Sequence, residues 1–189
     1  IRVGENNPGA DAGLVLGENI TITAPASYGV SIFGNNAPES KLTLKVYGTI
    51  HVTANAAAVS GNGTDNSAET NITIYDGAEL ISENALAVYH PQVGTLTIKG
   101  GTITGETGIE MRAGTLVVND GEITATGKYN VEENGNGNTT KGAAVAIAQH
   151  NTKKDISVTI NGGTFKGDRS LSEANPQKNE TPNIKINVT

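Results

Sequence analysis

Apolar and polar residues alternate along the chain in short segments that recur with a common arrangement. An apolar-polar-apolar segment is followed after two or three residues by Gly, and one or two residues later by another apolar position. Alternation with period two is typical of a β-strand, whose neighbouring side chains point to opposite faces. Full copies begin at Leu42, Ile72, Leu96, Leu116 and Val158, and partial copies begin at Ile20 and Ile184.

Another alternating segment precedes each full copy, so each repeat contains three short strands. These first strands begin at Val30, Ala57, Leu86, Ile109 and Val145, and Leu14–Leu16 is a candidate for an earlier one. Three short strands cannot bury their apolar face alone, but repeats stacked as coils can pair strand with strand. The pattern therefore predicts a parallel β-helix. Its expected inward stacks are Leu42, Ile72, Leu96, Leu116 and Val158 on one wall, and Ile32, Val59, Val88, Met111 and Ile147 on another.

Composition supports this interpretation and excludes several kinds of site. The chain has 24 Gly, 2 Phe, no Trp and no Cys, so disulfides, Cys-ligated metals and thiol nucleophiles are excluded. The Gly at each bend between the second and third strands is expected to need positive φ or close backbone approach. These glycines are Gly77, Gly101, Gly121 and Gly163. A β-sandwich is the alternative fold, although it predicts no shared three-strand unit.

Two segments carry a family resemblance. Leu96–Gly105 and Val158–Gly167 resemble coils of right-handed β-helix domains of the pectate-lyase-like superfamily, as found in bacterial surface proteins. The resemblance covers roughly residues 13–188 and implies the right-handed sense. The expected fold is all-β: a single-stranded right-handed parallel β-helix with three short strands per coil and about six to seven coils. One domain is expected over residues 1–189, with a cap or linker at 1–12, coils at 13–168 and a C-terminal coil and tail at 169–189.

The charge pattern argues against nucleic acid as a partner. The net charge is −6, and the 13 Lys and Arg residues are scattered along the chain. No apolar run approaches the roughly 20 residues of a spanning helix, so no membrane insertion is expected. The sequence begins at Ile1 without a visible signal peptide, and we expect it to be part of a longer multidomain chain, extracellular or on a bacterial surface.

Catalytic chemistry is not recognisable in the pattern. The superfamily's lyases resemble one another in an acidic calcium cluster and a basic residue on the first-strand face. Here the expected outward residues of that strand are Ser31, Ala58, Ala87, Glu110 and Ala146, with a single carboxylate. No metal or cofactor is therefore assigned. Residues 127–142 are expected to form a mobile polar loop, with a binding loop or weak calcium site at Glu132, Glu133 and Asn134 as the alternative.

A candidate ligand site follows the first strands along one rim of the coils. Aromatic faces beside planar polar groups are suited to sugars, which offer C–H faces and hydroxyls. The candidate glycan-binding residues are Phe33, Tyr89, His90, Glu110, Arg112, Gln149 and His150. In the alternative interpretation, Phe33 and Tyr89 merely cover the coil edge and Glu110 forms a surface ion pair with Arg112. If the rim is exposed, Arg112→Ala and Tyr89→Ala should weaken glycan retention with little change in melting temperature.

The leading functional hypothesis is a non-catalytic extracellular bacterial surface module, an adhesin or stalk, that binds host or microbial glycans weakly along one face. The alternatives are a fragment of a polysaccharide lyase or glycoside hydrolase, or a structural spacer without a ligand. A less favoured hypothesis is ice binding by a row of outward threonines interrupted by Val117. That row comprises Thr21, Thr43, Thr73, Thr97 and Thr159.

Overall fold

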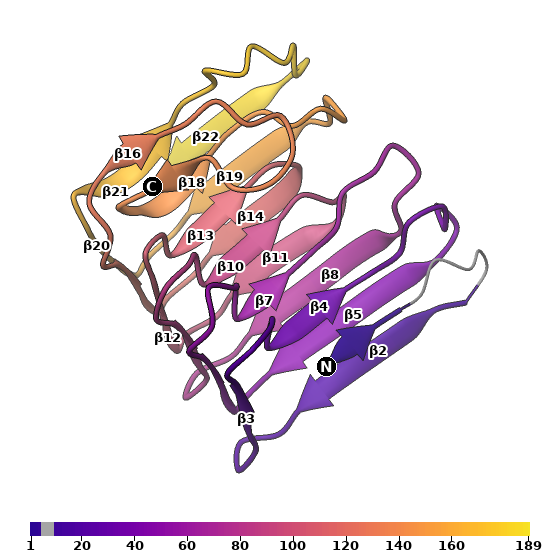
Figure 1. The fold of residues 1–189 in the computed structure, drawn as a ribbon, viewed down its shortest axis with the longest axis vertical. Coiled ribbons are helices and arrows are strands. Elements are labelled where there is room, and N and C mark those ends of the chain that lie inside the picture. Colours follow the sequence, from indigo (N-terminus) through magenta and orange to yellow (C-terminus); the bar gives the residue numbers. More distant parts are fainter. Residues whose placement is uncertain (5–9) are drawn as a thin grey trace.

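The chain folds into stacked coils whose strands form three parallel sheets (Figure 1). This computed structural model describes residues 1–4 and 10–189, and these residues form no helix, hence none that could span a membrane. The first sheet has seven strands: β1 (Arg2–Val3), β4 (Val30–Ile32), β7 (Val59–Ser60), β10 (Val88–His90), β13 (Ile109–Met111), β18 (Ala143–Ile147) and β21 (Arg169–Glu173). A three-strand parallel β-helix with about seven coils is therefore confirmed.

The other two sheets complete each coil. The second sheet has seven strands: β2 (Ala12–Leu16), β5 (Lys41–Val46), β8 (Glu69–Ile74), β11 (Thr95–Ile98), β14 (Gly114–Val118), β19 (Ile156–Ile160) and β22 (Ile184–Val188). The third sheet has six: β3 (Thr21–Ala24), β6 (Thr49–Val52), β9 (Glu79–Ser82), β12 (Thr102–Gly105), β15 (Glu122–Ala125) and β20 (Thr164–Lys166). Between β15 and β18, an antiparallel pair, β16 (Asn130–Val131) and β17 (Thr140–Lys141), departs from the coil pattern.

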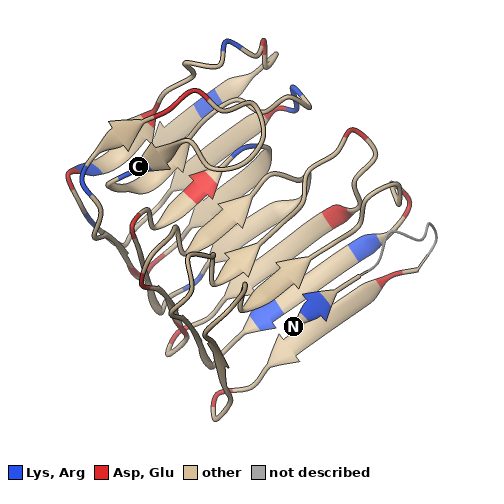
Figure 2. Cartoon of the chain, viewed as in Figure 1, with Lys and Arg blue, Asp and Glu red and all other residues tan. Residues whose placement is uncertain are grey.

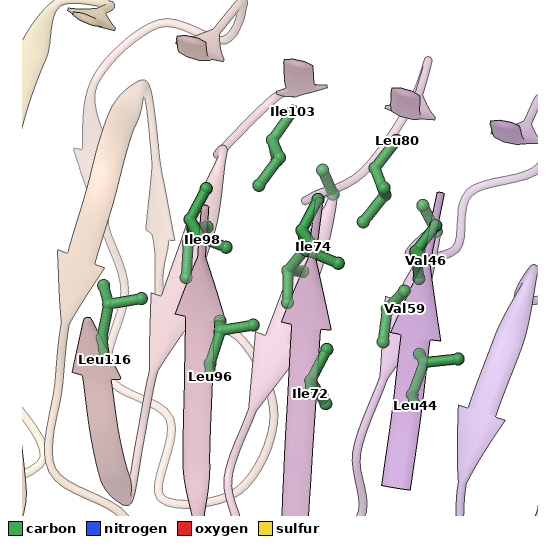
Figure 3. Close-up of a cluster of buried hydrophobic side chains, with 14 of the residues drawn as sticks. Leu44, Val46, Val59, Ile72, Ile74, Leu80, Leu96, Ile98, Ile103 and Leu116 are labelled. Carbon is green, nitrogen blue, oxygen red and sulfur yellow. The ribbon is translucent and has the colours of Figure 1, made fainter. Parts of the chain in front are cut away.

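Aliphatic side chains fill the lumen in stacks, one layer per coil. Figure 3 shows Leu116, Leu96 and Ile72 side by side on neighbouring strands of the second sheet, with Ile103 of the third sheet across the lumen. All four residues are buried in one apolar cluster that runs through the coils. The scarcity of aromatics thus has a structural reason: each layer is narrow, and aliphatic side chains fill it.

The register of the second sheet corrects the expected stack at its N-terminal end. Ile72 pairs with Leu44 rather than with Leu42, which lies opposite Thr70. The expected partial copy at Ile20 is also wrong, because β3 belongs to the third sheet and pairs with β6. Leu14–Leu16 lies in the second sheet beside β5 and is not an early first strand. The displacement between Leu42 and Leu44 leaves both side chains in the core, because a shift of two residues preserves the face.

The bend glycines behave as the sequence predicts. Gly77, Gly101, Gly121 and Gly163 have φ values of 78°, 81°, 111° and 104°, in the region that L side chains rarely adopt. At Gly101, a Cβ would lie 2.5 Å from the carbonyl oxygen of Ala78 in the preceding coil. Glycine is thus needed there for both backbone conformation and close coil stacking.

The expected threonine row is not continuous. Thr73, Thr97, Val117 and Thr159 are register neighbours, but Lys45 takes the next place beside Thr73. Thr43 lies in a different row opposite Asn71, and Thr21 is on the third sheet. The structure thus contradicts the row on which the ice-binding hypothesis depended.

The segment expected to be an N-terminal cap or linker is strand at both of its ends. Arg2–Val3 pairs with β4, and Ala12 begins β2; residues 5–9 of this segment lie outside the described residues. At the C-terminal end, β21 and β22 add strands to the first and second sheets.

Candidate functional site

The register of the first sheet decides which of the predicted rim residues are neighbours. Val30, Val59, Val88 and Ile109 are register partners, so the expected alignment of Ile32 and Met111 with Val59 and Val88 is displaced by two residues. As a result Tyr89 lies beside Glu110, and not beside Arg112. The seven predicted residues therefore do not form one continuous rim.

His90 faces the lumen instead of the rim. It is the register partner of Met111, a core residue, and alternates with outward Tyr89. The residue is 1% exposed, and its Nδ1 lies 3.3 Å from the carbonyl oxygen of Ala113. Burial lowers the pKa of the imidazole, which favours its neutral form. The expectation that His90 lies on the exposed rim is wrong.

Glu110 and Arg112 point away from the lumen, but a loop covers them. Residues 127–142, hereafter the covering loop, form the orange segment that includes β16 and lies over the first sheet in Figure 1. Both charged side chains are 0% exposed, and Arg112 Nη1 lies 3.6 Å from Glu110 Oε1. The expected surface ion pair is therefore a buried one.

Glu110 holds the covering loop through three donors. Its carboxylate accepts hydrogen bonds from the backbone N–H of Thr139 (2.8 Å), the Thr139 hydroxyl (2.9 Å) and the backbone N–H of Thr140 (3.3 Å). Burial raises the pKa of this carboxyl, while the Arg112 charge and the Thr139 and Thr140 donors oppose that rise. These partners leave Glu110 occupied by structural contacts.

Arg112 is bound almost entirely by backbone carbonyl groups. Its Nε donates to the carbonyl oxygens of Ala148 (3.1 Å) and Gln149 (3.0 Å), and its Nη2 donates to that of Asn134 (2.8 Å). Nη1 also donates to the carbonyl oxygen of Gly137. The guanidinium thus joins the covering loop to the segment after β18, and no part of it is exposed for binding a ligand.

His150 fastens the covering loop from the other side. Its Nε2 donates to Asn136 Oδ1 (3.1 Å), and its Nδ1 accepts from the Thr152 hydroxyl (3.0 Å) and the Thr152 backbone N–H (3.3 Å). Burial, and then the nearby Arg112 charge, lower the pKa of His150 to about 4. The neutral Nε2–H tautomer satisfies all of these bonds.

Three predicted residues remain: Gln149, Phe33 and Tyr89. Gln149 takes part through its backbone: its carbonyl oxygen accepts from Gln177 Nε2 (2.8 Å) as well as from Arg112. Phe33 follows β4, and the guanidinium carbon of Arg2 sits 4.0 Å from its ring centroid. One ring face of Phe33 is thus covered by this cation, and the residue is partly exposed. Tyr89 is buried, but it lines a hollow.

The open space beside Tyr89 is a hollow of about 260 Å³ between the covering loop and the start of the first strands. We call it the tyrosine hollow. Its lining residues are Tyr28, Ala57, Ser60, Gly61, Asn62, Leu86, Tyr89, Asn136, Gly137 and Asn138. None of these described residues carries a formal charge, so the hollow combines two phenol rings, three carboxamides and a hydroxyl without a catalytic carboxylate pair.

The two tyrosines have different roles in the hollow. Tyr89 is 8% exposed, and its hydroxyl oxygen accepts a hydrogen bond from the backbone N–H of Gly137 (2.9 Å). Burial raises the pKa of Tyr89 to about 12, so its own O–H remains available as a donor at neutral pH. Tyr28 is 46% exposed and offers a ring to solvent. The site thus has a fixed polar donor and an accessible aromatic side chain.

Two of the three candidate calcium ligands take part in hydrogen bonds within the covering loop. Glu132 accepts from the Asn130 side chain (3.1 Å), whereas Asn134 bonds within the loop to Asn136 N–H (3.1 Å) and the Asn138 carbonyl oxygen (3.2 Å). Among the residues that the structure describes, no group of three or more His, Cys, Asp and Glu side chains could hold a metal ion.

Sequence reasoning missed Tyr28 and Asn62. Tyr28 lies two residues before Val30, as Ala57 and Leu86 lie two residues before the register partners Val59 and Val88. A correct register would have placed these three residues in one row and drawn attention to its aromatic member. Asn62 has no such signal, because it lies in the connection that follows the first strand of each coil, and this connection differs in length from coil to coil.

Comparisons with protein-family models, with curated proteins and with solved structures found no match to this chain.

Proposed function

We propose that this chain is a non-catalytic extracellular surface module of a bacterial protein, an adhesin or stalk, which binds glycans weakly in the tyrosine hollow. As part of the same proposal, we assign the chain to the pectate-lyase-like superfamily. The observation that supports glycan binding is the tyrosine hollow, which combines Tyr28, Tyr89 and three asparagine side chains on the coil stack.

The chemistry of the hollow matches that of a neutral sugar. The Tyr28 ring can cover the C–H face of a pyranose, and carboxamides can both donate to and accept from its hydroxyls. The small size of the hollow limits the contact to about one or two sugar units, which favours weak affinity. Neutral lining groups favour uncharged glycans over acidic ones.

A binding role without catalysis is supported by the state of the nearest carboxylate. Glu110 is buried beside the hollow, but three donors from Thr139 and Thr140 and the Arg112 guanidinium already occupy it. A general acid or base must reach the substrate atom from which or to which a proton moves. The described lining of the hollow offers no carboxylate for that step.

The test is a glycan array with the wild type, Tyr28→Ala and Tyr75→Ala. Tyr75 is a matched control because it is also a partly exposed tyrosine, stacked on Tyr47 (ring centroids 4.0 Å apart) away from the hollow. We expect Tyr28→Ala to lose binding to the bound glycans and Tyr75→Ala to retain it, with both variants folded. Binding that persists in Tyr28→Ala would reject the hollow as the site.

A further inference from the structure

A second open feature lies on the outer face of the second sheet, away from the lumen. It is a groove of about 510 Å³ at the N-terminal ends of β11, β14 and β19, hereafter the lysine groove. Its floor carries Thr95, Thr115 and Ser157, and the loop before β19 contributes Lys153 and Lys154. We infer that the lysine groove binds a linear sulfated polysaccharide that lies across the coils.

The floor of the groove is a row of hydroxyl groups in strict register. Thr95 pairs with Thr115, and Thr115 pairs with Ser157. Because these residues alternate with buried Leu96, Leu116 and Val158, their side chains point outward. None of the three hydroxyls has a hydrogen-bond partner within the described part of the chain. They are therefore free to donate to a ligand.

The same row ends in a positive charge. Ser157 pairs with Lys185 in β22, so a third lysine continues the row beyond Ser157, which lines the groove together with Lys153 and Lys154. Figure 2 shows blue segments on β22 and on the loop that leads into β19. Of the described carboxylates, none forms an ion pair with these three lysines, whereas Lys41, Lys141 and Lys166 each have one.

The charge of the cluster is local, since the whole chain has a net charge of −6. Asp155 also lines the groove and carries a negative charge, so the three lysines face one carboxylate there. Both Asp155 oxygens accept hydrogen bonds from Asn183: Oδ1 from the backbone N–H (3.2 Å) and Oδ2 from Nδ2 (3.0 Å). A polyanion is repelled by most of an acidic protein and is held only where cations gather. Binding by general electrostatic attraction is thereby disfavoured.

The spacing of the hydroxyl groups and the type of cationic donor indicate which class of polyanion fits the lysine groove. Strands in neighbouring coils lie about 4.8 Å apart, so successive hydroxyls follow one another at roughly the repeat of a sugar chain. Lysine ammonium groups act as point charges, and the lining contains no arginine to hold a planar carboxylate by two parallel bonds. A sulfate offers three oxygens in a pyramid, which can accept from an ammonium group and a hydroxyl together.

The test measures retention of fluorescent dextran sulfate, neutral dextran and polygalacturonate by the immobilised chain at several salt concentrations. We expect dextran sulfate to bind in a salt-sensitive manner and K153Q/K154Q to bind it about tenfold more weakly. The control K99Q/K45Q removes the same charge from lysines outside the groove and should retain binding. Equal weakening in both double variants, or equal binding of neutral dextran, would overturn the inference.

Two further variants separate the hydroxyl row from the lysine charges, and the lysine groove from the tyrosine hollow. Thr115→Val keeps the branched shape but removes a hydroxyl, and we expect roughly threefold weaker dextran sulfate binding at an unchanged melting temperature. Tyr28→Ala should leave dextran sulfate binding intact, because the tyrosine hollow is on the first sheet. If the tyrosine hollow proves not to bind neutral glycans, the inference about the lysine groove still stands. Polygalacturonate binding as tight as that of dextran sulfate would refute the selectivity for sulfate.

Discussion

The buried ion pair beneath the covering loop makes a quantitative prediction about stability. In Arg112→Met the side chain keeps an unbranched apolar stem but loses the guanidinium with its charge and its donors, so Glu110 becomes a buried carboxylate without its cation. Loss of one partner from a buried pair typically costs about 3–5 kcal/mol. For a chain of this size each 1 kcal/mol lowers the melting temperature by about 2–4 °C, so a fall of about 6–20 °C is expected.

The control is an ion pair whose charged atoms lie closer together than those of Glu110 and Arg112 but whose side chains are exposed to solvent. Lys166 Nζ lies 2.7 Å from Glu122 Oε2, and these side chains are 55% and 44% exposed. Lys166→Met should therefore cost less than about 1 kcal/mol. Thermal and urea unfolding followed by far-ultraviolet circular dichroism suits a chain without Trp.

A double variant separates the lost charge pairing from the lost packing. Glu110→Gln/Arg112→Met removes the unpaired carboxylate and should recover part of the stability lost in Arg112→Met alone. If Arg112→Met and Lys166→Met were equally mild, the covering loop would not bury the pair, and Arg112 would belong on the open surface that the sequence suggested.

Three other perturbations test separate parts of the structure. In the folded protein the pKa of His150 is lowered to about 4, so on acidification its imidazole is protonated in the unfolded chain before it is in the folded one, and stability should fall as pH drops from about 6.5 towards 4. The melting temperature of His150→Gln should fall less over this range. Identical pH profiles for the wild type and the variant would contradict the assignment of a buried, neutral His150. Gly94→Ala places a Cβ 2.2 Å from the Thr70 carbonyl oxygen at a φ of +110°, whereas Gly77→Ala at +78° meets nothing within 4 Å; urea unfolding should show a loss of more than about 2 kcal/mol for the first and about 1 kcal/mol for the second, and similar losses would argue against the close coil approach. Leu96→Ala should cost about 2–5 kcal/mol and Thr97→Ala within about 0.5 kcal/mol by the same assay, and a reversed order would show that the strand faces are exchanged.

The sequence predicted the coil architecture because a period of two and a recurring glycine bend are local signals. The same period explains the main error: Leu42 and Leu44 are both apolar and both point inward, so the pattern cannot decide which of them pairs with Ile72. A shift of two residues leaves the core composition unchanged. In the first sheet the same ambiguity holds between Ile109 and Met111, and the resulting shift moves the outward neighbours, so Tyr89 was aligned with Arg112 instead of Glu110.

The covering loop shows a second limit of local reasoning. Its Gly- and Asn-rich sequence is typical of a mobile surface loop, but Glu110 and Arg112 lie in an earlier coil and supply partners for its backbone groups. Contacts between residues about 22–30 positions apart leave no periodic trace in either segment. The burial of Glu110 and Arg112, and the hollow beside Tyr89, were consequently beyond prediction from the pattern.

The parallel register also determines how the chain responds to a pulling force. Hydrogen bonds between coils run along the stack, and the two ends of the chain lie toward opposite ends of it (Figure 1). Tension between the ends therefore loads one coil's bonds at a time, as in opening a zipper, and does not shear a whole sheet. The 20 residues between partners Leu96 and Leu116 would release about 70 Å of length, and the 42 residues from Leu116 to Val158 about 150 Å. A coil stack with these spacings lengthens in unequal steps, and the longest of them, from Leu116 to Val158, opens the covering loop.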